Sequence, residues 1–355
     1  MTVRTNLTRL TLFVALVVLS ASARAEVYHH YFGNTHAHSR FSDGKENPAD
    51  HFRLAKGAGY DFYAITDHAL ARLKGYTPEN WETTKREADE ATDSSFVAIV
   101  GFEFSENDGP GGTGHLNALN TASTLDATGP KVTLPVFYDW LVNQPKNVAA
   151  SFNHPSPTSH NAFDYLTSER RDVVTMYEMI NSGKLRYEGF LAALNKGWRV
   201  APIAAEDGHG TGRIASDRYR TGVLAAGLTR ENIMQAVRAR RVYCTWDKNL
   251  RLTFRANGEI MGSVLENPHD LTITVRASDP DLKNAKDRIT RIEIVGENGK
   301  VVRSKDFSAH TVSWNVALKQ MEKYYFVQVY TADKTDGPTA YSAPIWIENP
   351  VAMRL

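Results

Sequence analysis

Short apolar segments alternate with amphipathic segments from about residue 28 to residue 246. The apolar segments end beside Gly, Asp, Asn or Pro, which is typical of buried strands. The amphipathic segments have a helical period, and the first begins at Pro48 and ends near Gly57. Strand and helix alternation of this length predicts a parallel α/β sheet or barrel. The expected strands lie within residues 28–36, 60–68, 96–105, 147–155, 173–181 and 199–209, and the expected helices within residues 48–59, 81–93, 186–198 and 229–241.

The helical period disappears after about residue 248. Leu271, Ile273 and Val275 alternate with polar residues, as in a strand with one buried face. Asn298 and Gly299 lie between two apolar runs and predict a β-hairpin. The sequence therefore predicts two domains, an α/β domain at 26–248 and a small antiparallel β-sandwich at 249–355, joined without a long linker.

The first 25 residues are interpreted as a targeting segment. Arg4 and Arg9 precede an apolar run at residues 10–19, and Ala23-Arg24-Ala25 fits the small-x-small rule for signal peptidase. The run is about half of the roughly 20 residues that a membrane span needs. We therefore expect a cleaved signal peptide and an exported protein, periplasmic or secreted, without stable membrane insertion after cleavage.

The charge of the expected mature chain is close to zero. The 41 basic residues fall to 38 when Arg4, Arg9 and Arg24 are removed, against 40 acidic residues. This balance argues against long nucleic acids as partners and favours a small-molecule ligand. The one cysteine, Cys244, allows no internal disulfide, so the fold is expected to depend on its core or on metal.

The distribution of histidine carries the strongest functional signal. Ten of the twelve histidines precede residue 210, and six of these lie at or just beyond predicted strand ends. In α/β barrels the carboxyl ends of the strands form one rim, where side chains distant in sequence converge. His36 and His38 are two residues apart, which places both side chains on one face. The other candidate metal ligands are Asp43, His68, Glu103, His115, His154, Asp207 and His209.

Glu103 is a carboxylate within an apolar run, which is costly unless the group is paired or bound to metal. Imidazole with carboxylate, and without thiolate, suits Zn, Mn or Fe, whereas an all-oxygen site would favour Mg or Ca. Each motif alone has an ordinary explanation as a chance pair, a capping residue or an ion pair. Six histidines and three carboxylates at strand ends together indicate a metal centre.

The segments HAHSRFSDG, ITDH, GFEFS, GHLN, NHP and DGH, in this order and at these spacings, resemble the successive motifs of the polymerase and histidinol phosphatase (PHP) superfamily. The resemblance covers about residues 30–246. It implies a distorted seven-stranded β/α barrel with two or three metal ions at its carboxyl rim, and phosphatase, phosphodiesterase or nuclease activity. The expected export signal and the sandwich further resemble, more loosely, an exported branch of carbaryl-hydrolase-like metallohydrolases.

The resemblance also implies a ligand set for each ion. The first ion would be held by His36, His38, Glu103 and Asp207. The second would share Glu103 as a bridge and add His115 and His154, and the third would lie on Asp43, His68 and His209. Ions that share Glu103 would hold a bridging water and lower its pKa from about 15.7 toward roughly 7, giving a hydroxide for hydrolysis.

Other residues are expected to orient the substrate or the ligands. Arg40 and Arg213 are candidate catalytic residues that bind a phosphate oxygen through the guanidinium, with a surface ion pair as the alternative, and Asp207 is a catalytic candidate as well as a ligand. Glu178 and Asn181 are expected to support the ligands. His160 is either a general acid or a solvated loop residue. The glycine-rich stretch at 109–114 is expected to be a flexible loop and not a nucleotide-binding motif.

Three functions remain open from the sequence. The first is an exported metal-dependent hydrolase of small phosphate esters, which include phosphomonoesters, phosphodiesters and lipid head groups. The second is a carbamate or carboxylic ester hydrolase on the same metal centre. The third is a binding protein in which the metal is structural.

Overall fold

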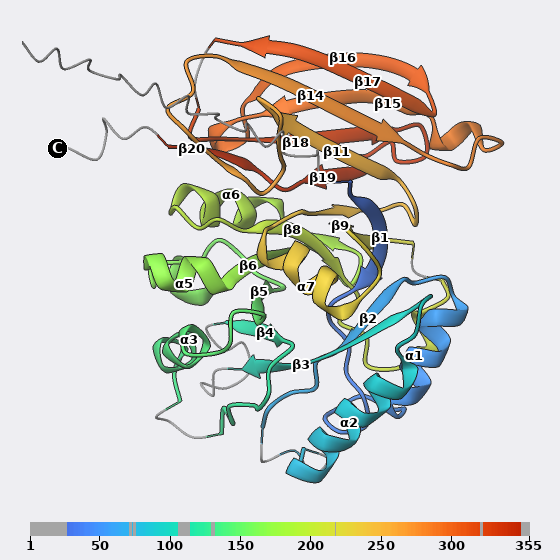
Figure 1. Cartoon of the computed structure of the whole chain (residues 1–355), viewed down its shortest axis with the longest axis vertical. Coiled ribbons are helices and arrows are strands. Elements are labelled where there is room, and N and C mark those ends of the chain that lie inside the picture. The colour runs from blue at the N-terminus through green and yellow to red at the C-terminus, as the bar shows by residue number, and fades with distance from the viewer. Residues whose placement is uncertain are drawn as a thin grey trace, which may run out of the picture.

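A computed structural model of the chain shows a β-rich half stacked on a mixed α/β half (Figure 1). The expected signal peptide lies outside the described residues. Within the described part of the chain, no helix combines the length and the apolar character of a membrane span. The structure describes residues 27–70, 73, 76–105, 114–128, 132–216, 218–319 and 322–348.

The first half contains all of the α-helices that the structure describes. Each of the six predicted strands contains an observed strand, and Thr229 caps α7 by accepting a hydrogen bond from the Asn232 backbone nitrogen. The short strand pair β9 and β10 was not predicted. The elements are β1 (His29–Asn34), α1 (Pro48–Gly57), β2 (Phe62–Ile65), α2 (Pro78–Ala91), β3 (Val97–Ser105), β4 (His115–Leu119), α3 (Leu134–Val142), β5 (Ala149–Asn153), α4 (Ser159–Ala162), α5 (Ser168–Val173), β6 (Val174–Asn181), β7 (Lys184–Leu185), α6 (Tyr187–Asn195), β8 (Ala201–Ala205), the 3-10 helix η1 (Thr211–Arg213), β9 (Arg220–Ala225), α7 (Arg230–Arg238) and β10 (Val242–Thr245).

The strands of the first half form a continuous hydrogen-bonded run in the order β1, β2, β3, β4, β5, β6 and β8. The run is mixed and not parallel throughout, because β4 is antiparallel to both of its neighbours. This corrects the expectation of a purely parallel sheet. The antiparallel direction has a consequence for the site, since it puts the first residue of β4, His115, at the same edge as the carboxyl ends of β3 and β5.

The first and last strands of this run approach each other without forming a regular ladder. β1 pairs along its length with β9, and β8 pairs with β6. Beyond their ends they meet at one bridge, where Ala37 lies opposite Gly208. The mixed α/β class is therefore confirmed. The expected closed barrel is not, because no continuous ladder joins β1 to β8 among the described strands.

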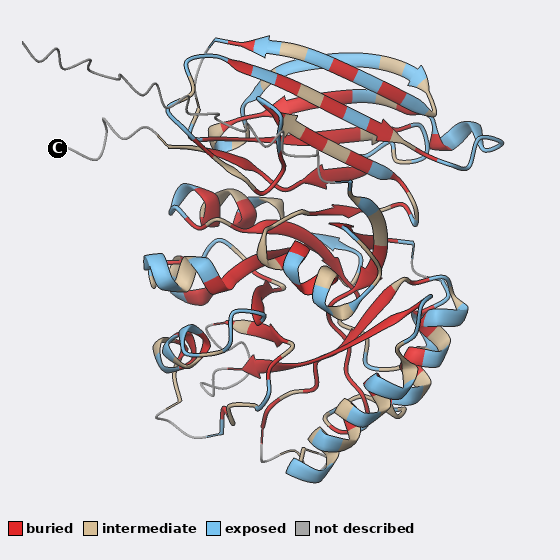
Figure 2. Ribbon diagram, in the orientation of Figure 1, coloured by how far each residue is buried: buried red, intermediate tan, exposed pale blue. Residues whose placement is uncertain are grey.

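The second half consists of β-strands with two short 3-10 turns. The alternation predicted for residues 271–278 is confirmed, since the residues of β14 alternate between buried and more exposed (Figure 2). The predicted hairpin at Asn298 and Gly299 is also confirmed, because both residues have positive φ and join antiparallel β15 and β16. The elements are β11 (Arg251–Ala256), β12 (Glu259–Ile260), β13 (Val264–Glu266), β14 (Leu271–Ser278), η2 (Ala285–Asp287), β15 (Ile289–Val295), η3 (Glu297–Gly299), β16 (Val301–Ala309), β17 (Thr311–Leu318), β18 (Tyr324–Thr331), β19 (Ala340–Ser342) and β20 (Ile345–Glu348).

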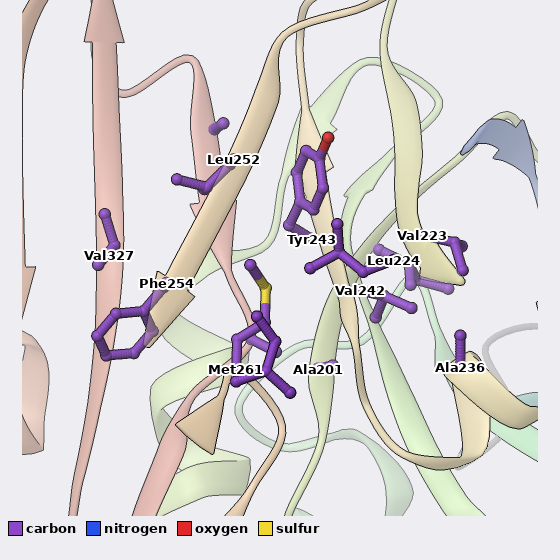
Figure 3. Packing of buried hydrophobic residues seen from close by; sticks show 14 of the residues in the cluster. Ala201, Val223, Leu224, Ala236, Val242, Tyr243, Leu252, Phe254, Met261 and Val327 are labelled. Atoms are coloured by element: carbon purple, nitrogen blue, oxygen red, sulfur yellow. The ribbon is translucent and has the colours of Figure 1, made fainter. Parts of the chain in front are cut away.

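These strands form two layers. One is a four-stranded antiparallel sheet in the order β12, β11, β14 and β17. The other continues into the first half, because β19 pairs with β10, which in turn pairs with β9. Apolar residues of both halves pack in one cluster, where Val242 and Tyr243 of β10 lie near Leu252 and Phe254 of β11 (Figure 3). The β-rich half is thus joined to the site-bearing half by a shared sheet and a shared core.

Candidate metal centre

The segment that follows β1 is held on both sides by backbone hydrogen bonds. The Ala37 carbonyl accepts from the Thr66 nitrogen at 2.8 Å, and the His36 carbonyl accepts from the Asp207 nitrogen at 3.0 Å. The His38 nitrogen donates to the Gly208 carbonyl at 2.8 Å. Because side chains two residues apart in extended backbone share a face, His36 and His38 point together, with their Nε2 atoms 3.0 Å apart.

Glu103 lies at the centre of the histidines. Its side chain is 1% exposed, near the carboxyl end of β3. Oε1 lies 3.5 Å from His36 Nε2, 3.2 Å from His115 Nδ1 and 3.4 Å from His154 Nε2. Oε2 lies 3.5 Å from His38 Nε2 and 3.1 Å from His68 Nδ1. One carboxylate therefore faces five imidazoles that come from four separate segments of the sequence, since His36 and His38 share one segment.

Asp207 and Asp43 complete the cluster. Asp207 Oδ1 lies 3.4 Å from His36 Nε2 and 3.3 Å from His38 Nε2. Asp43 Oδ2 lies 3.5 Å from His68 Nε2 and 3.3 Å from His209 Nε2. Asp43 and His209 are the most exposed members, so this side of the cluster faces solvent.

The ligand atoms fall into three groups in which all members lie within 4.8 Å of one another. All nine candidate ligands of the sequence analysis belong to at least one group. These groups differ from the implied ligand sets in two ways. His38 belongs to two groups. Glu103 is grouped only with His115 and His154, although it also lies 3.5 Å from His36 and from His38. The groups are His36, His38 and Asp207; Glu103, His115 and His154; and His38, Asp43, His68 and His209.

The spacing of these atoms fits shared cations better than direct hydrogen bonds. Ligand atoms about 2.0–2.2 Å from one ion in tetrahedral geometry lie about 3.3–3.6 Å from one another. The contacts between Glu103 or Asp207 and the imidazoles of His36 and His38 span 3.3–3.5 Å, longer than a good charge-assisted hydrogen bond. The mixed nitrogen and oxygen donor set, without sulfur, matches Zn, Mn or Fe. The residues present therefore fit divalent metal ions.

A second layer of polar residues orients the ligands. Glu178 Oε1 lies 2.7 Å from His36 Nδ1, and the Asn153 amide donates to Glu103 Oε1 at 2.8 Å. The Asn181 amide donates to Glu178 Oε2 at 3.0 Å and approaches Asp207 Oδ2 at 3.5 Å. Glu178 and Asn181 thus occupy the supporting positions expected from the sequence. Asn153 was missed, although its place at the end of β5, next to His154, was a usable signal.

Asp67 is a further supporting residue that sequence reasoning left without a role. Its carboxylate accepts hydrogen bonds from the Ser39 nitrogen at 2.7 Å, the Ser39 hydroxyl at 2.6 Å and the Ser42 hydroxyl at 2.6 Å. These bonds fix the turn between His38 and Asp43. The turn is tight, because a Cβ at Gly44 would lie 2.2 Å from the His38 carbonyl oxygen.

The electrostatics of the cluster are set by burial and by opposite charges. Burial opposes a charge on His36, but Asp207, Glu178 and Glu103 raise its pKa well above the usual value. Burial likewise opposes ionisation of Glu103, but the neighbouring imidazoles hold its pKa well below the usual value. The hydrogen bond with Asp43 raises the pKa of His209 to about 9. Protons and cations therefore compete for the same nitrogens.

Two candidate ligands have strained backbone conformations. Asp207 has φ of 50° and His154 has φ of 32°, in the left-handed region that non-glycine residues seldom adopt. Such conformations persist where the surrounding structure imposes them, and they concentrate at functional sites. His154 follows directly on β5 and Asp207 lies two residues beyond the end of β8, and their side chains point toward Glu103 and His36, respectively.

The remaining candidates lie outside the cluster. Arg40 and Arg213 are exposed, and the Arg213 guanidinium approaches the Tyr219 hydroxyl at 3.5 Å. His160 is buried and not a solvated loop residue, and its Nε2 lies 2.8 Å from the His115 carbonyl. Burial lowers the pKa of His160 to about 3, and its Nε2–H donates to the His115 carbonyl, so the ring does not fit the role of a general acid. Most of the glycine-rich stretch at 109–114 lies outside the described residues.

Comparisons with known proteins gave matches only among solved structures. No family model and no curated protein matches the chain. A two-domain protein from Bacteroides vulgatus containing a predicted PHP-like metal-dependent phosphoesterase is 16% identical, covering 90% of this chain and 96% of its own, with a TM-score of 0.49.

Two further structures match about half of this chain. A protein from Bifidobacterium adolescentis, described provisionally as a metal-dependent phosphoesterase, is 16% identical, covering 51% of this chain and 88% of its own, with a TM-score of 0.31. An amidohydrolase from Chromobacterium violaceum, solved with sulfate and without metal, is 14% identical with the same coverage and the same TM-score.

Proposed function

We propose that this chain is an exported, metal-dependent phosphoesterase of the PHP superfamily, acting on phosphate esters of small molecules or lipid head groups. The observation that carries the proposal is the position of Glu103, a buried carboxylate 3.1–3.5 Å from five imidazole nitrogens. A lone buried ion pair would need one such partner and not five. The order of the histidine motifs and the mixed α/β fold support the same family.

Two or three divalent ions, Zn, Mn or Fe, are the proposed cofactors. His36, His38 and Asp207 would hold one, Glu103, His115 and His154 a second, and His38, Asp43, His68 and His209 a third. Such ions, when bound, supply Lewis acidity toward a phosphoryl oxygen and lower the pKa of a water molecule.

The chain itself contributes orientation. The contact between Glu178 and His36 Nδ1 selects the tautomer in which Nε2 presents its lone pair to the cluster. The Asn153 amide keeps Glu103 Oε1 directed at His115 and His154. Asp67 fixes the turn that carries Asp43. These contacts hold the ligands in place before substrate arrives, so less ordering is needed during the reaction.

We propose a phosphate ester rather than a carboxylic ester as the substrate because the three groups of candidate metal ligands lie next to one another. Two ions about 3.5–4 Å apart stabilise both the attacking and the leaving oxygen of an in-line displacement at phosphorus. His38 belongs to two neighbouring groups, and Glu103 of the third group lies 3.5 Å from His36 and His38, so the groups are placed for such a pair. Arg40 and Arg213 lie on the chain segments that carry His38 and His209, and we propose that their guanidinium groups meet the phosphate oxygens.

The proposal is tested by hydrolysis assays on the Zn-loaded and Mn-loaded protein with bis-nitrophenyl phosphate, nitrophenyl phosphate and naphthyl carbamate. Asp207→Asn removes one ligand charge while keeping the side-chain size, and the exposed His269→Gln is the matched control. We expect hydrolysis of one of the phosphates, a loss of at least about a hundredfold in Asp207→Asn, and no loss in the control.

The outcomes separate the candidate functions. Hydrolysis of the carbamate alone would replace the phosphoesterase proposal by the carbamate or carboxylic ester hydrolase. Binding of metal without hydrolysis of any of the three would favour a structural metal site. Equal rates for the wild type and Asp207→Asn would exclude catalysis at this cluster.

A further inference from the structure

A second group of carboxylates lies in the β-rich half. Asp279, Asp281 and Asp287 belong to the loop between β14 and β15, and each offers an oxygen within 4.8 Å of the others. Asp279 and Asp287 are 1% and 3% exposed, whereas Asp281 faces solvent. Among the described residues, no ion pair is formed by any of the three. Arg218, whose charge acts on Asp287, pairs with Asp247 at 3.2 Å and with Asp333 at 3.5 Å.

Two oxygens at this place lack a hydrogen-bond partner although they are buried. One is Asp279 Oδ2; the other oxygen of that carboxylate, Oδ1, accepts from the Asp281 nitrogen at 2.8 Å. The second is Asn249 Oδ1, whose amide nitrogen donates to Asp281 Oδ2 at 3.2 Å. A buried acceptor without a partner is costly, and a carboxylate oxygen in that state more so. A cation bound by the three aspartates would satisfy Asp279 Oδ2.

The electrostatics add to this cost. Burial and the neighbouring carboxylates of Asp247, Asp287 and Asp281 disfavour a negative charge on Asp279. The carboxylates repel one another, and the Arg218 guanidinium is engaged by Asp247 and Asp333. A divalent cation would turn this repulsion into attraction.

We propose that Asp279, Asp281 and Asp287 form a calcium site distinct from the histidine cluster, with the Asn249 amide nitrogen holding Asp281 in place. Oxygen donors alone select a hard cation. Three chain carboxylates and an irregular loop suit calcium, which accepts six to eight oxygens at about 2.3–2.6 Å and therefore spans donors up to about 5 Å apart. Magnesium demands a near-ideal octahedron and usually takes one or two carboxylates.

The position of the proposed calcium site, near the junction of the two halves, gives the ion a structural role. Asn249 belongs to the connection between β10 and β11, where the chain passes from the first half to the second, and the three aspartates belong to the β14–β15 loop. Calcium would therefore tie the loop of the β-rich half to the junction of the two halves. The expected consequence is a higher unfolding temperature in the presence of calcium and not a change in the chemistry at the histidine cluster.

The test is calorimetric titration of calcium chloride, and separately magnesium chloride, into the full chain already loaded with zinc or manganese. The variants are Asp279→Asn and the exposed Asp281→Asn, with Asp306→Asn, an exposed partner of Arg291, as the matched control. We expect one saturable calcium per chain with a Kd of about 10⁻⁵–10⁻³ M, and magnesium at least about tenfold weaker. Both site variants should weaken calcium binding at least about tenfold, and the control should bind as the wild type does.

Thermal unfolding supplies an independent readout. Calcium should raise the Tm of the wild type and of Asp306→Asn, and leave that of Asp279→Asn nearly unchanged. Without calcium, Asp279→Asn should be at least as stable as the wild type, because it removes one of the repelling charges. No calcium uptake by the wild type up to about 10 mM, equal affinity in the site variants, or equal affinity for magnesium would overturn the proposal.

Discussion

Glu178 connects two of the proposed ligands through one carboxylate: Oε1 lies 2.7 Å from His36 Nδ1, and Oε2 accepts a hydrogen bond from the His154 backbone nitrogen at 2.6 Å. Both residues flank Glu103, at 3.5 Å and 3.4 Å. Glu178 is fully buried in β6 and is not itself in any of the three ligand groups. It therefore fixes the angle between two ligands that approach Glu103 from different strands.

Replacing Glu178 by glutamine should weaken metal binding without abolishing it. The amide keeps the size of the side chain but loses the charge that favours the His36 tautomer with a free Nε2, and loss of such a partner typically costs about 10–100-fold in metal affinity. Zinc affinity is measured by competition with a chromogenic chelator. Glu188→Gln, an exposed glutamate of α6, is the control and should bind zinc as the wild type does. Unchanged affinity in Glu178→Gln would remove its orienting role.

Gly114→Ala should destabilise the fold next to His115. A Cβ at this position would lie 2.2 Å from His160 Cδ2, and that ring cannot move freely because it packs against Phe152 and stacks on Phe163. Overpacking of this kind costs about 1–3 kcal/mol, measurable by urea unfolding. Gly57→Ala, where a Cβ meets nothing within 4 Å, is the control. Equal losses in both variants would show that the cost comes from the backbone and not from His160.

The stability of the protein should fall in mild acid partly through His30. This histidine is partly buried, with Nδ1 3.0 Å from the Tyr243 hydroxyl, and burial together with Arg251 and His29 lowers its pKa to about 4. The unfolded chain takes up the His30 proton near pH 6.5, and the folded chain takes it up only near pH 4. The contribution of neutral His30 to the free energy of unfolding is therefore present above pH 6.5 and is lost as the pH falls from 6.5 to 4. The loss can reach about 3 kcal/mol.

His30→Gln cannot take up that proton. The unfolding free energy of this variant should therefore fall less between pH 7 and pH 4.5 than that of the wild type, by about 2 kcal/mol or more. Chemical denaturation at the two pH values gives the comparison. Parallel losses in the two proteins would assign the acid sensitivity to other groups.

The sequence predicts the local parts of this fold well, because they depend on local patterns. The spacing of His36 and His38 determines their common direction, and the alternation at Leu271, Ile273 and Val275 determines the buried face of β14. The capping role of Thr229 is equally local. In each case the interacting positions lie within a few residues of one another, so no knowledge of the tertiary structure is needed.

The parts that sequence reasoning missed depend on which strands become neighbours. The antiparallel direction of β4 is set by its pairing with both β3 and β5, and it decides that His115 reaches the ligand cluster from the beginning of a strand. Asn153 and Asp67 act on Glu103 and Ser39, residues 50 and 28 positions away. Their roles follow from distances that no local pattern contains.

Metal content per chain tests the central claim most directly. The protein is saturated with zinc or manganese, freed of unbound metal and analysed by plasma mass spectrometry, together with Glu103→Gln and with Glu293→Gln, a buried glutamate of β15 that accepts a hydrogen bond from Tyr330 away from the cluster. We predict two or three ions per chain in the wild type and in Glu293→Gln, and the loss of at least one ion in Glu103→Gln. Fewer than one ion in the wild type, or the same content in Glu103→Gln, would contradict a metal centre built around Glu103.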